Sequence, residues 1–298
     1  MPFFSIVIPV FNREDFIMDT INSILSGHEP DFEIIIVDDG STDSFNKMMN
    51  EKFLSNPKIK IIRQENKERG AARNNGFKNS TGDYVVFFDS DDIMHPDHLE
   101  VLQRKIIIEN YPDFIATKFV LQRKNKIIPS DLAKLHEGYY DYRLFLNGNP
   151  LACNICVKRT NPKLKLFEED RKYAIKEDWM FMLQNLVSNK LFLVDKVTVT
   201  MNDHENRSMR SDQKQIIEKT FLAFEWIKKN VALNSHDLKS LLAHVNYFSA
   251  IHSYIDFKRV NALRYLWNAI RIKGLKKKYL VLAAKIIIGK KFISKIAS

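Results

Sequence analysis

Three aspartates and a serine follow an apolar run and are the residues of this chain best suited to chemistry. Residues 84–88 have the composition of a buried strand, and Asp89-Ser90-Asp91-Asp92 comes directly after it. Side chains alternate between the faces of a strand, so Asp89 and Asp91 should point the same way and could share one divalent ion. Carboxylates this close resist ionisation unless a cation or a donor lies among them. The tetrapeptide therefore predicts a Mg²⁺ or Mn²⁺ site that holds an anionic substrate, most simply a diphosphate. A solvated acidic turn before the next helix is the alternative.

The elements that must position these acids alternate between strand and helix. Strands are predicted at residues 4–8, 32–37, 59–62 and 84–88, and helices at 14–26, 42–54, 70–79 and 96–110. This alternation predicts an α/β fold, with a Rossmann-like, mostly parallel sheet and helices on both of its faces. Ligands of such sheets bind beyond the carboxyl ends of the strands. Asp38 and Asp39 follow the second strand, so they should share a cleft with the Asp89 cluster.

The second half of the chain changes character. Strands are predicted at 114–121 and 152–157 and a helix at 177–187, and from about residue 212 the pattern is wholly helical. Helices are predicted there at 216–229, 236–254, 259–272 and 277–288. We therefore expect a catalytic domain over residues 1–210 and an all-helical C-terminal appendage over residues 211–298.

The charge of the chain is concentrated at its C-terminal end. The formal net charge is +10, yet residues 258–298 contain twelve Lys and Arg and no Asp or Glu, so the first 257 residues carry −2. A slightly acidic body argues against a nucleic-acid-binding protein. Helices that place apolar residues beside many basic ones are typical of a segment lying on anionic lipid. We expect residues 258–298 to bind an anionic membrane surface; packing on the catalytic domain is the alternative.

Other signals are weaker. Cys153 and Cys156 form a lone C-x-x-C without a second ligand pair, so both are expected to be reduced strand residues. No signal peptide is recognised, and the apolar stretch at 279–289 is too short to span a bilayer. We expect a cytoplasmic protein, peripheral on the cytoplasmic face of the inner membrane.

Five motifs, in this order, resemble the signature of family-two, inverting glycosyltransferases of the GT-A fold. They are SIVIPVFNRE at 5–14, IVDDGSTD at 36–43, GAARN at 70–74, FDSDD at 88–92 and KEDW at 176–179. The resemblance covers roughly residues 3–210, and five ordered motifs are far more specific than one. It implies metal-dependent transfer of a hexosyl or N-acetylhexosaminyl group from a UDP-sugar to a glycan or lipid-linked acceptor, as in cell-surface polysaccharide biosynthesis.

The resemblance also implies roles for individual residues. The donor-binding set is Pro9, Phe11, Asn12, Asp38, Asp39, Arg73, Asn74, Asp89 and Ser90. Within it Phe11 would stack on the nucleobase, as an aromatic ring can, and Asp39 would accept from the uracil imide. Asp91 would be the direct metal ligand, with Asp89 beside it. Arg73 can pair either with phosphate or with the acidic cluster.

The last motif supplies the catalytic candidates. Glu177 and Asp178 open a predicted helix, whose N-terminus favours carboxylates in any case. The family correspondence makes Asp178 the general base, and the neighbouring Glu177 would raise its pKa. Further on, His204, Arg207 and Arg210 belong to a looser segment that resembles one closing over the diphosphate in relatives; an exposed loop is the alternative.

Other functions fit the sequence less well. A sugar-nucleotide pyrophosphorylase opens with a glycine-rich phosphate loop, whereas this chain has no glycine before Gly27. A dinucleotide dehydrogenase needs G-x-G-x-x-G, and no G-x-G occurs. The non-enzymatic alternative is a protein that binds membranes or anionic polymers through its basic tail alone.

Overall fold

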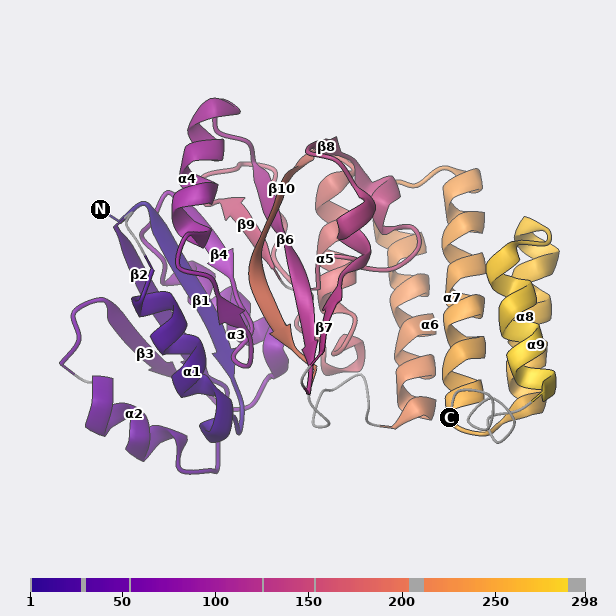
Figure 1. Ribbon diagram of the computed structural model, residues 1–298, viewed down its shortest axis with the longest axis horizontal. Coiled ribbons are helices and arrows are strands. Elements are labelled where there is room, and N and C mark those ends of the chain that lie inside the picture. The colour runs from indigo at the N-terminus through magenta and orange to yellow at the C-terminus, as the bar shows by residue number, and fades with distance from the viewer. Residues whose placement is uncertain are drawn as a thin grey trace. The chain divides into compact units, whose positions relative to one another are not determined.

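The computed structural model describes residues 2–27, 31–53, 55–124, 126–152, 154–203 and 212–288 (Figure 1). Contacts divide these residues into two compact units. The sheet unit comprises the described residues up to 144 and from 149 to 203, and the helical unit comprises residues 145–148 and 212–288. The domain boundary expected at residue 210 falls outside the described residues.

The sheet unit begins with four parallel strands. These are β1 (Phe4–Val10), β2 (Phe32–Asp38), β3 (Ile59–Arg63) and β4 (Tyr84–Phe87), paired in the order β3-β2-β1-β4. All seven residues of β1 are buried, as expected for a parallel strand covered on both faces. Its pairing with β4 ends at Val7 and Phe87, so Pro9 lies past the last residue pair of that ladder. The parallel core predicted from the sequence is confirmed.

The sheet continues with strands of mixed direction. β9 (Ile155–Lys158), β6 (Phe114–Arg123), β10 (Leu191–Asn202) and β5 (Ile93–Met94) follow β4 in that order, while β7 (Lys126–Pro129) pairs with β6 and β8 (Gly138–Tyr140) with β10. Among the described strands of this half, β10 and β6 pair in parallel and the other pairs are antiparallel. The free thiol of Cys156 is buried in β9, and Cys153 lies outside the described residues.

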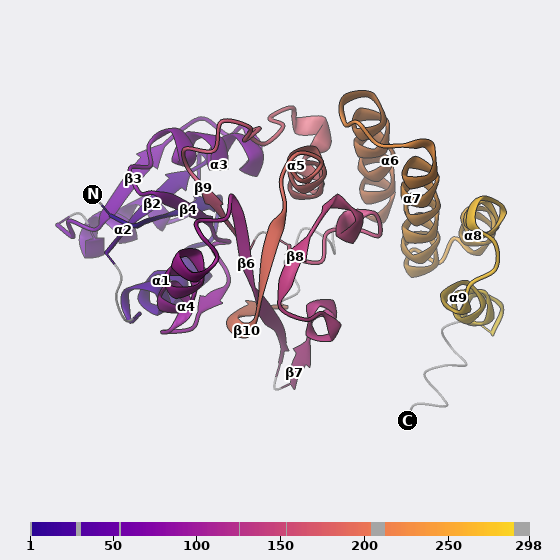
Figure 2. The ribbon, with the colours of Figure 1, turned by 90° about the horizontal axis from the view of Figure 1, so that it is seen from above.

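Helices cover both faces of this sheet. They are α1 (Glu14–Leu25), α2 (Phe45–Phe53), α3 (Glu68–Lys78), α4 (His98–Ile108) and α5 (Glu177–Leu186), with short 3-10 turns η1 (Asp131–Lys134), η2 (Tyr142–Phe145) and η3 (Arg171–Tyr173). α1 and α4 lie on one face and α3 and α5 on the other (Figure 2). Phe77 of α3 and Phe181 of α5 both pack against Phe87, with ring centroids 6.4 and 5.9 Å away. A Cβ on Gly76 would lie 2.3 Å from Val7, so only glycine lets α3 approach β1 this closely.

The helical unit contains α6 (Gln213–Asn230), α7 (Ser235–Ile255), α8 (Arg259–Lys273) and α9 (Lys277–Ile288). Asp212 and Asn234 cap α6 and α7 by accepting from backbone N–H groups of the first turn. The core between α7, α8 and α9 uses alanines at closely packed positions, Ala250, Ala262 and Ala269. No helix within the described ranges has the length and apolar content needed to cross a membrane.

Candidate active site

The turns after β1 and β2 are tied to each other. Asn12 adopts a left-handed φ of 51°, which asparagine tolerates, and its side-chain oxygen accepts from the N–H of Thr42 at 2.8 Å. The N–H of Asn12 donates in turn to the hydroxyl of Ser41 at 3.0 Å. Phe11 beside it is 45% exposed, whereas Pro9 is buried in β1. The aromatic ring is therefore available at the strand end for a flat ligand.

The two aspartates after β2 are both buried. Asp38 accepts from the N–H of Ser41 and from Arg63, each at 2.8 Å, so it closes the turn. One oxygen of Asp39 accepts from the side chain of Gln64 at 2.7 Å and from the N–H of Lys67 at 2.8 Å. These bonds fix the Asp39 carboxylate against the residues that lead into α3.

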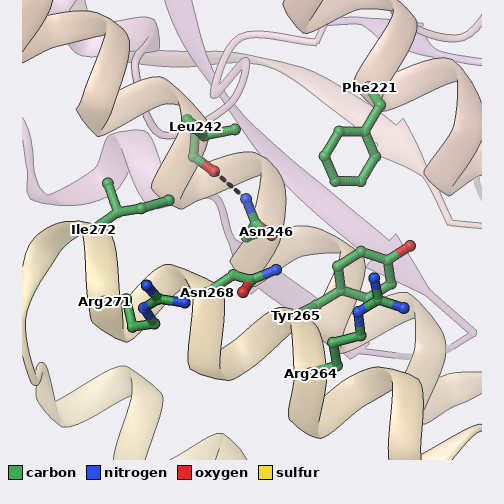
Figure 3. A pocket seen from close by; sticks show the side chains of 8 residues that line it. All are labelled: Phe221, Leu242, Asn246, Arg264, Tyr265, Asn268, Arg271 and Ile272. Atoms are coloured by element: carbon green, nitrogen blue, oxygen red, sulfur yellow. Dashed lines mark hydrogen bonds between the residues drawn. The ribbon is translucent and has the colours of Figure 1, made fainter.

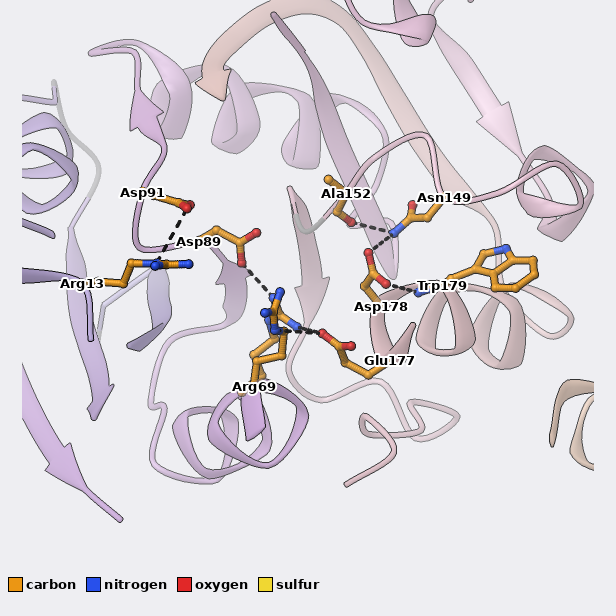
Figure 4. A network of polar contacts seen from close by, with 10 residues as sticks. Arg13, Arg69, Asp89, Asp91, Asn149, Ala152, Glu177, Asp178 and Trp179 are labelled. Carbon is orange, nitrogen blue, oxygen red and sulfur yellow. Dashed lines mark hydrogen bonds and ion pairs between the residues drawn. The ribbon is translucent and has the colours of Figure 1, made fainter. Parts of the chain in front are cut away.

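The acidic turn after β4 divides into a structural and an accessible part. Asp92 is buried; its carboxylate accepts from the N–H of Asn202 and its carbonyl accepts from Thr20. Asp89 and Asp91 keep carboxylates that are partly exposed, 26% and 15% respectively. The Nε of Arg13 lies 3.9 Å from Asp91, as Figure 4 shows. The two carboxylates expected to bind metal are thus the two in this turn that remain partly exposed to solvent.

Arg73 joins this turn to the start of α5. Its guanidinium is buried and lies 2.8 Å from both the Asp89 and the Glu177 carboxylates. Arg69 lies 3.7 Å from the same Glu177 oxygen, and the other Glu177 oxygen is buried with no hydrogen-bond partner among the described residues (Figure 4). Of the two roles open to Arg73 from the sequence, the geometry favours pairing with the acidic cluster.

Asn74 is engaged with the chain itself. Its amide donates to the carbonyl of Phe167 and to Glu169, and its oxygen accepts from the N–H of Phe167. This side chain clamps the segment before η3 onto α3. A direct contact of Asn74 with the nucleotide stays a prediction, as does that of the buried Ser90.

Asp178 has the environment of a general base. Burial and the negative charge of Glu177 raise the pKa of Asp178 to about 6, against the opposing effect of Arg73. One of its oxygens accepts from the N–H of Trp179 at 2.7 Å and the other from the amide of Asn149 at 2.9 Å (Figure 4). A carboxylate with a pKa near neutrality can accept a proton from a hydroxyl group effectively.

The backbone next to Asp178 is strained. Ile175 has a φ of 83°, and a β-branched residue in this region is an outlier. Burial lowers the pKa of the following Lys176 to about 8, even though Asp178 and Glu177 favour its charged form. Strain and displaced pKa values of this kind cluster at functional sites.

The residues present fit a divalent cation bound together with a substrate. Asp89 and Asp91 offer hard oxygen ligands, and Mg²⁺ is usually held by one or two carboxylates plus substrate phosphates. Asp89 and Asp91 would thus supply two carboxylates, and the phosphates of a bound substrate could complete the coordination. Among the described residues, which do not include His204, no group of three or more His, Cys, Asp or Glu side chains is placed to hold a metal.

The segment expected to close over the diphosphate cannot be compared with its prediction. His204, Arg207 and Arg210 lie outside the described residues, so their predicted contact with the diphosphate stays untested.

Asn149 was not identified from the sequence, because an isolated asparagine in a loop with glycine and proline has the signature of a turn. Only the fold brings it to Asp178.

Hydrogen bonds and ion pairs link all five motifs. Asn12 joins the first to the second, Arg13 and Asp91 the first to the fourth, and Arg73 the third, fourth and fifth. The family model for glycosyl transferase family 2 matches residues 5–160, just over half of the chain. This chain belongs to glycosyl transferase family 2.

Relatives in this family differ in length. An uncharacterized glycosyltransferase of Haemophilus influenzae is 30% identical over 220 residues, which cover 68% of this chain and 83% of the relative. The amylovoran biosynthesis glycosyltransferase AmsB of Erwinia amylovora is 28% identical over 225 residues, 70% of this chain and 74% of AmsB. An uncharacterized glycosyltransferase of Rickettsia felis is 34% identical over 167 residues, 56% of this chain, but the match spans only 27% of that relative's length.

A solved structure has the same fold. TarS of S. aureus, crystallised with UDP-GlcNAc, superposes with a TM-score of 0.68 at 22% identity, covering 94% of this chain and 83% of the TarS chain. At this identity the likeness concerns the fold. The GT-A architecture with a helical C-terminal region, expected from the sequence, is confirmed.

Proposed function

We propose that this chain is an inverting glycosyltransferase that moves a sugar from a UDP-sugar onto a hydroxyl group of a glycan or lipid-linked saccharide. The observation that carries the proposal is the buried Arg73, 2.8 Å from both Asp89 and Glu177. It holds the acidic turn beside the helix that bears Asp178. A donor diphosphate at Asp89 and Asp91 would therefore lie in the same site as the base.

The donor half of the site suits a uridine nucleotide. Phe11 is exposed for stacking, and the fixed Asp39 carboxylate suits the donor edge of uracil. The bound UDP-GlcNAc of TarS, a protein with the same fold, supports a UDP-sugar in this chain. Mg²⁺ or Mn²⁺ held by Asp91 and Asp89 would neutralise charge on the departing UDP.

The acceptor half is organised by Asp178. In the reaction its carboxylate takes the proton of the acceptor hydroxyl as that oxygen attacks the anomeric carbon and UDP departs from the opposite face. Because the reaction is a single displacement, the configuration of the anomeric carbon is inverted. Asn149 and the N–H of Trp179 aim the carboxylate. The role of AmsB in amylovoran biosynthesis supports a polysaccharide pathway, and residues 258–298 would keep the enzyme on the cytoplasmic face of the inner membrane.

Two substitutions test the assignment. Asp178→Asn should leave UDP-GlcNAc binding nearly unchanged, measured by calorimetry, and reduce transfer by about a thousandfold or more. Asp91→Asn should abolish the Mn²⁺-dependent part of donor binding and hydrolysis. Asp131→Asn, an exposed aspartate in η1, is the matched control. Wild-type turnover in either of the first two variants would refute the corresponding role.

A further inference from the structure

The last two helices carry two apolar stripes, and only one of them packs. Leu266, Leu282 and Ile286 point into the core formed with α7. Val260, Leu263 and Trp267 follow one another along α8 at helical spacing, yet Val260 is 80% and Trp267 60% exposed. Helical spacing alone does not distinguish the inward residues from the outward ones, whereas the structure separates them.

Further large apolar side chains are exposed near the outward stripe in the sequence. They include Leu275 between the helices, Leu280 and Ile287 of α9, and Phe257 before α8. Single exposed apolar residues are ordinary, but eight large ones lie between Phe257 and Ile287, a density that favours an interaction surface.

Positive charge accompanies this apolar surface. Residues 258–288 contain nine Lys and Arg and no Asp or Glu. Within the described residues only Lys258 among them has a carboxylate in ion-pair range, that of Asp256. Lys273 bonds to His236 and Lys278 lies over the ring of Tyr247, but neither contact supplies a negative charge, so the other cations of this segment have no carboxylate counter-ion among the described residues.

A pocket of about 550 Å³ lies beside the stripe. Figure 3 shows Arg264, Asn268 and Arg271 projecting from α8 along it. The rest of its lining comes from Tyr265 and Ile272 of α8, Phe221 of α6, and Leu242 and Asn246 of α7. Guanidinium and amide donors next to apolar walls, without an acid, suit a phosphate group attached to an apolar chain.

The turn before α8 displays an aromatic ring at a cost in backbone strain. The N–H of Lys258 bonds to the carbonyl of Ser253 and that of Phe257 to Tyr254, the pattern of a helix end that normally has glycine in the left-handed position. Phe257 occupies that position with a φ of 58°, and its side chain is 76% exposed. Strained backbone conformations cluster at functional sites, so an exposed phenylalanine in this conformation suggests a binding role.

We propose that Phe257, Val260, Trp267 and the exposed residues of α9 insert into an anionic phospholipid bilayer, while Arg264 and Arg271 bind a lipid phosphate in the pocket. This inference rests on the proposed function, because membrane binding would bring the transferase to a lipid-linked acceptor. Vesicle binding is measured without catalysis, so membrane binding can be disproved without disproving sugar transfer, and the reverse.

Other occupants fit less well. A symmetric contact between two copies would place this uncompensated positive surface against itself. A nucleic acid would satisfy the cations and could stack on Phe257 and Trp267, but it would leave the exposed valine, leucines and isoleucines without an apolar partner. A bilayer with anionic headgroups satisfies both the charge and the apolar surface.

The full chain is tested on phosphatidylcholine vesicles with and without phosphatidylglycerol. We expect binding only when phosphatidylglycerol is present, with quenching of tryptophan fluorescence by lipids brominated on their chains. The chain has three tryptophans, and Trp179 is buried in α5. Trp267→Phe should still bind but should lose the quenching.

Matched variants test the apolar residues and the arginines of this surface separately. Val260→Ser combined with Trp267→Ser should weaken vesicle binding about tenfold or more, whereas Ile127→Ser, 70% exposed in β7, should not. Arg264→Gln with Arg271→Gln should weaken binding about 25-fold, about fivefold for each charge, whereas the exposed Arg104→Gln should not.

Three results would overturn the proposal. They are absence of binding to phosphatidylglycerol vesicles, binding with Trp267 unquenched, and a lipid-free oligomer seen by light scattering that disappears on Trp267→Ser. Hydrolysis of UDP-GlcNAc is followed in the same preparations. Its absence from a wild-type protein that binds vesicles would count against the proposed function and leave the docking surface standing.

Discussion

The carboxylate of Asp178 depends on a residue that belongs to no motif. Asn149 donates to Asp178 and to the carbonyl of Ala152, a residue held at a left-handed φ of 50°. A hydrogen bond to the ionised form favours ionisation, so Asn149 opposes the effect of burial on the pKa of Asp178. Asn149 is therefore a positioning residue for the proposed base.

We expect Asn149→Ala to shift the pH dependence of sugar transfer. The rate should rise as Asp178 ionises near pH 6 in the wild type, the value to which burial and Glu177 raise its pKa. Without the amide donor the ionised form is less favoured, and this acid limb should move upward by about one pH unit. The pH profile of kcat/KM measures the shift. Asn230→Ala, at an exposed position of α6, is the control, and an unchanged limb in Asn149→Ala would contradict the role.

Residue types in the sequence singled out the acids but indicated their partners only in part. Asp89 and Glu177 could be singled out because acids after an apolar strand or at a helix start suggest chemistry. Pairing of Arg73 with the acidic turn, 16 positions away, was one of the two roles expected for it, but its bond to Glu177, 104 positions away, was not expected. Local patterns contain no information on contacts of this range, which the sheet order decides.

At the scale of elements, α4 is anchored to the sheet by a buried histidine. Nδ1 of His98 is 2.7 Å from the hydroxyl of Thr198 in β10, and Nε2 is buried with no hydrogen-bond partner among the described residues. Burial lowers the pKa of His98 from 6.5 to about 3. The ring is therefore neutral in the folded protein.

This predicts a loss of stability in mild acid. Below pH 6.5 the unfolded chain protonates the histidine, while the folded protein does not until about pH 3. The unfolded state then binds more protons, so the free energy of unfolding should fall with pH by up to about 1.4 kcal/mol per unit. Urea unfolding between pH 6.5 and 5 measures the slope. His98→Gln should reduce it, and equal slopes would show that other groups are responsible.

The helix end before α8 allows stability and membrane binding to be separated. Phe257→Gly should raise the free energy of unfolding by about 1 kcal/mol, because glycine adopts the left-handed conformation without strain. The same change should weaken binding to phosphatidylglycerol vesicles, because the exposed ring is lost. Phe257→Ala is the control: it should lose the binding without the gain in stability. A less stable Phe257→Gly protein would show that the ring packs rather than inserts.

Element prediction succeeded where the periodic pattern was unbroken. The four parallel strands and α9 were found close to their observed bounds, since apolar residues predominate in each of them. β10 was missed because Asp195 and Lys196 interrupt it, at the place where its register with β6 shifts. Two-residue β5 exists only through its pairing with β10, which no local pattern could reveal.

At the scale of the whole molecule, charge and function are segregated along the chain. The residues before 258 carry a net −2 and those from 258 onward +12. The sequence predicted this division, and also that the tail would form amphipathic helices. It could not tell which apolar residues pack inward, because both stripes of α8 repeat with helical spacing.

This segregation of charge predicts that salt weakens membrane binding but leaves hydrolysis of the sugar donor nearly unchanged. Attraction between exposed cations and anionic lipid is screened within about 10 Å at 0.1 M salt and about 3 Å at 1 M. Raising the salt concentration over this range should release the full-length protein from phosphatidylglycerol vesicles. Hydrolysis of UDP-GlcNAc should stay within about twofold, because Arg73 and Glu177 are buried and their ion pair is screened much less. Sedimentation of vesicles and UDP release are measured on the same samples. Retention on the vesicles at high salt would mean that the apolar stripe alone supplies the affinity, whereas parallel loss of hydrolysis would mean that the exposed cations also act in the donor site.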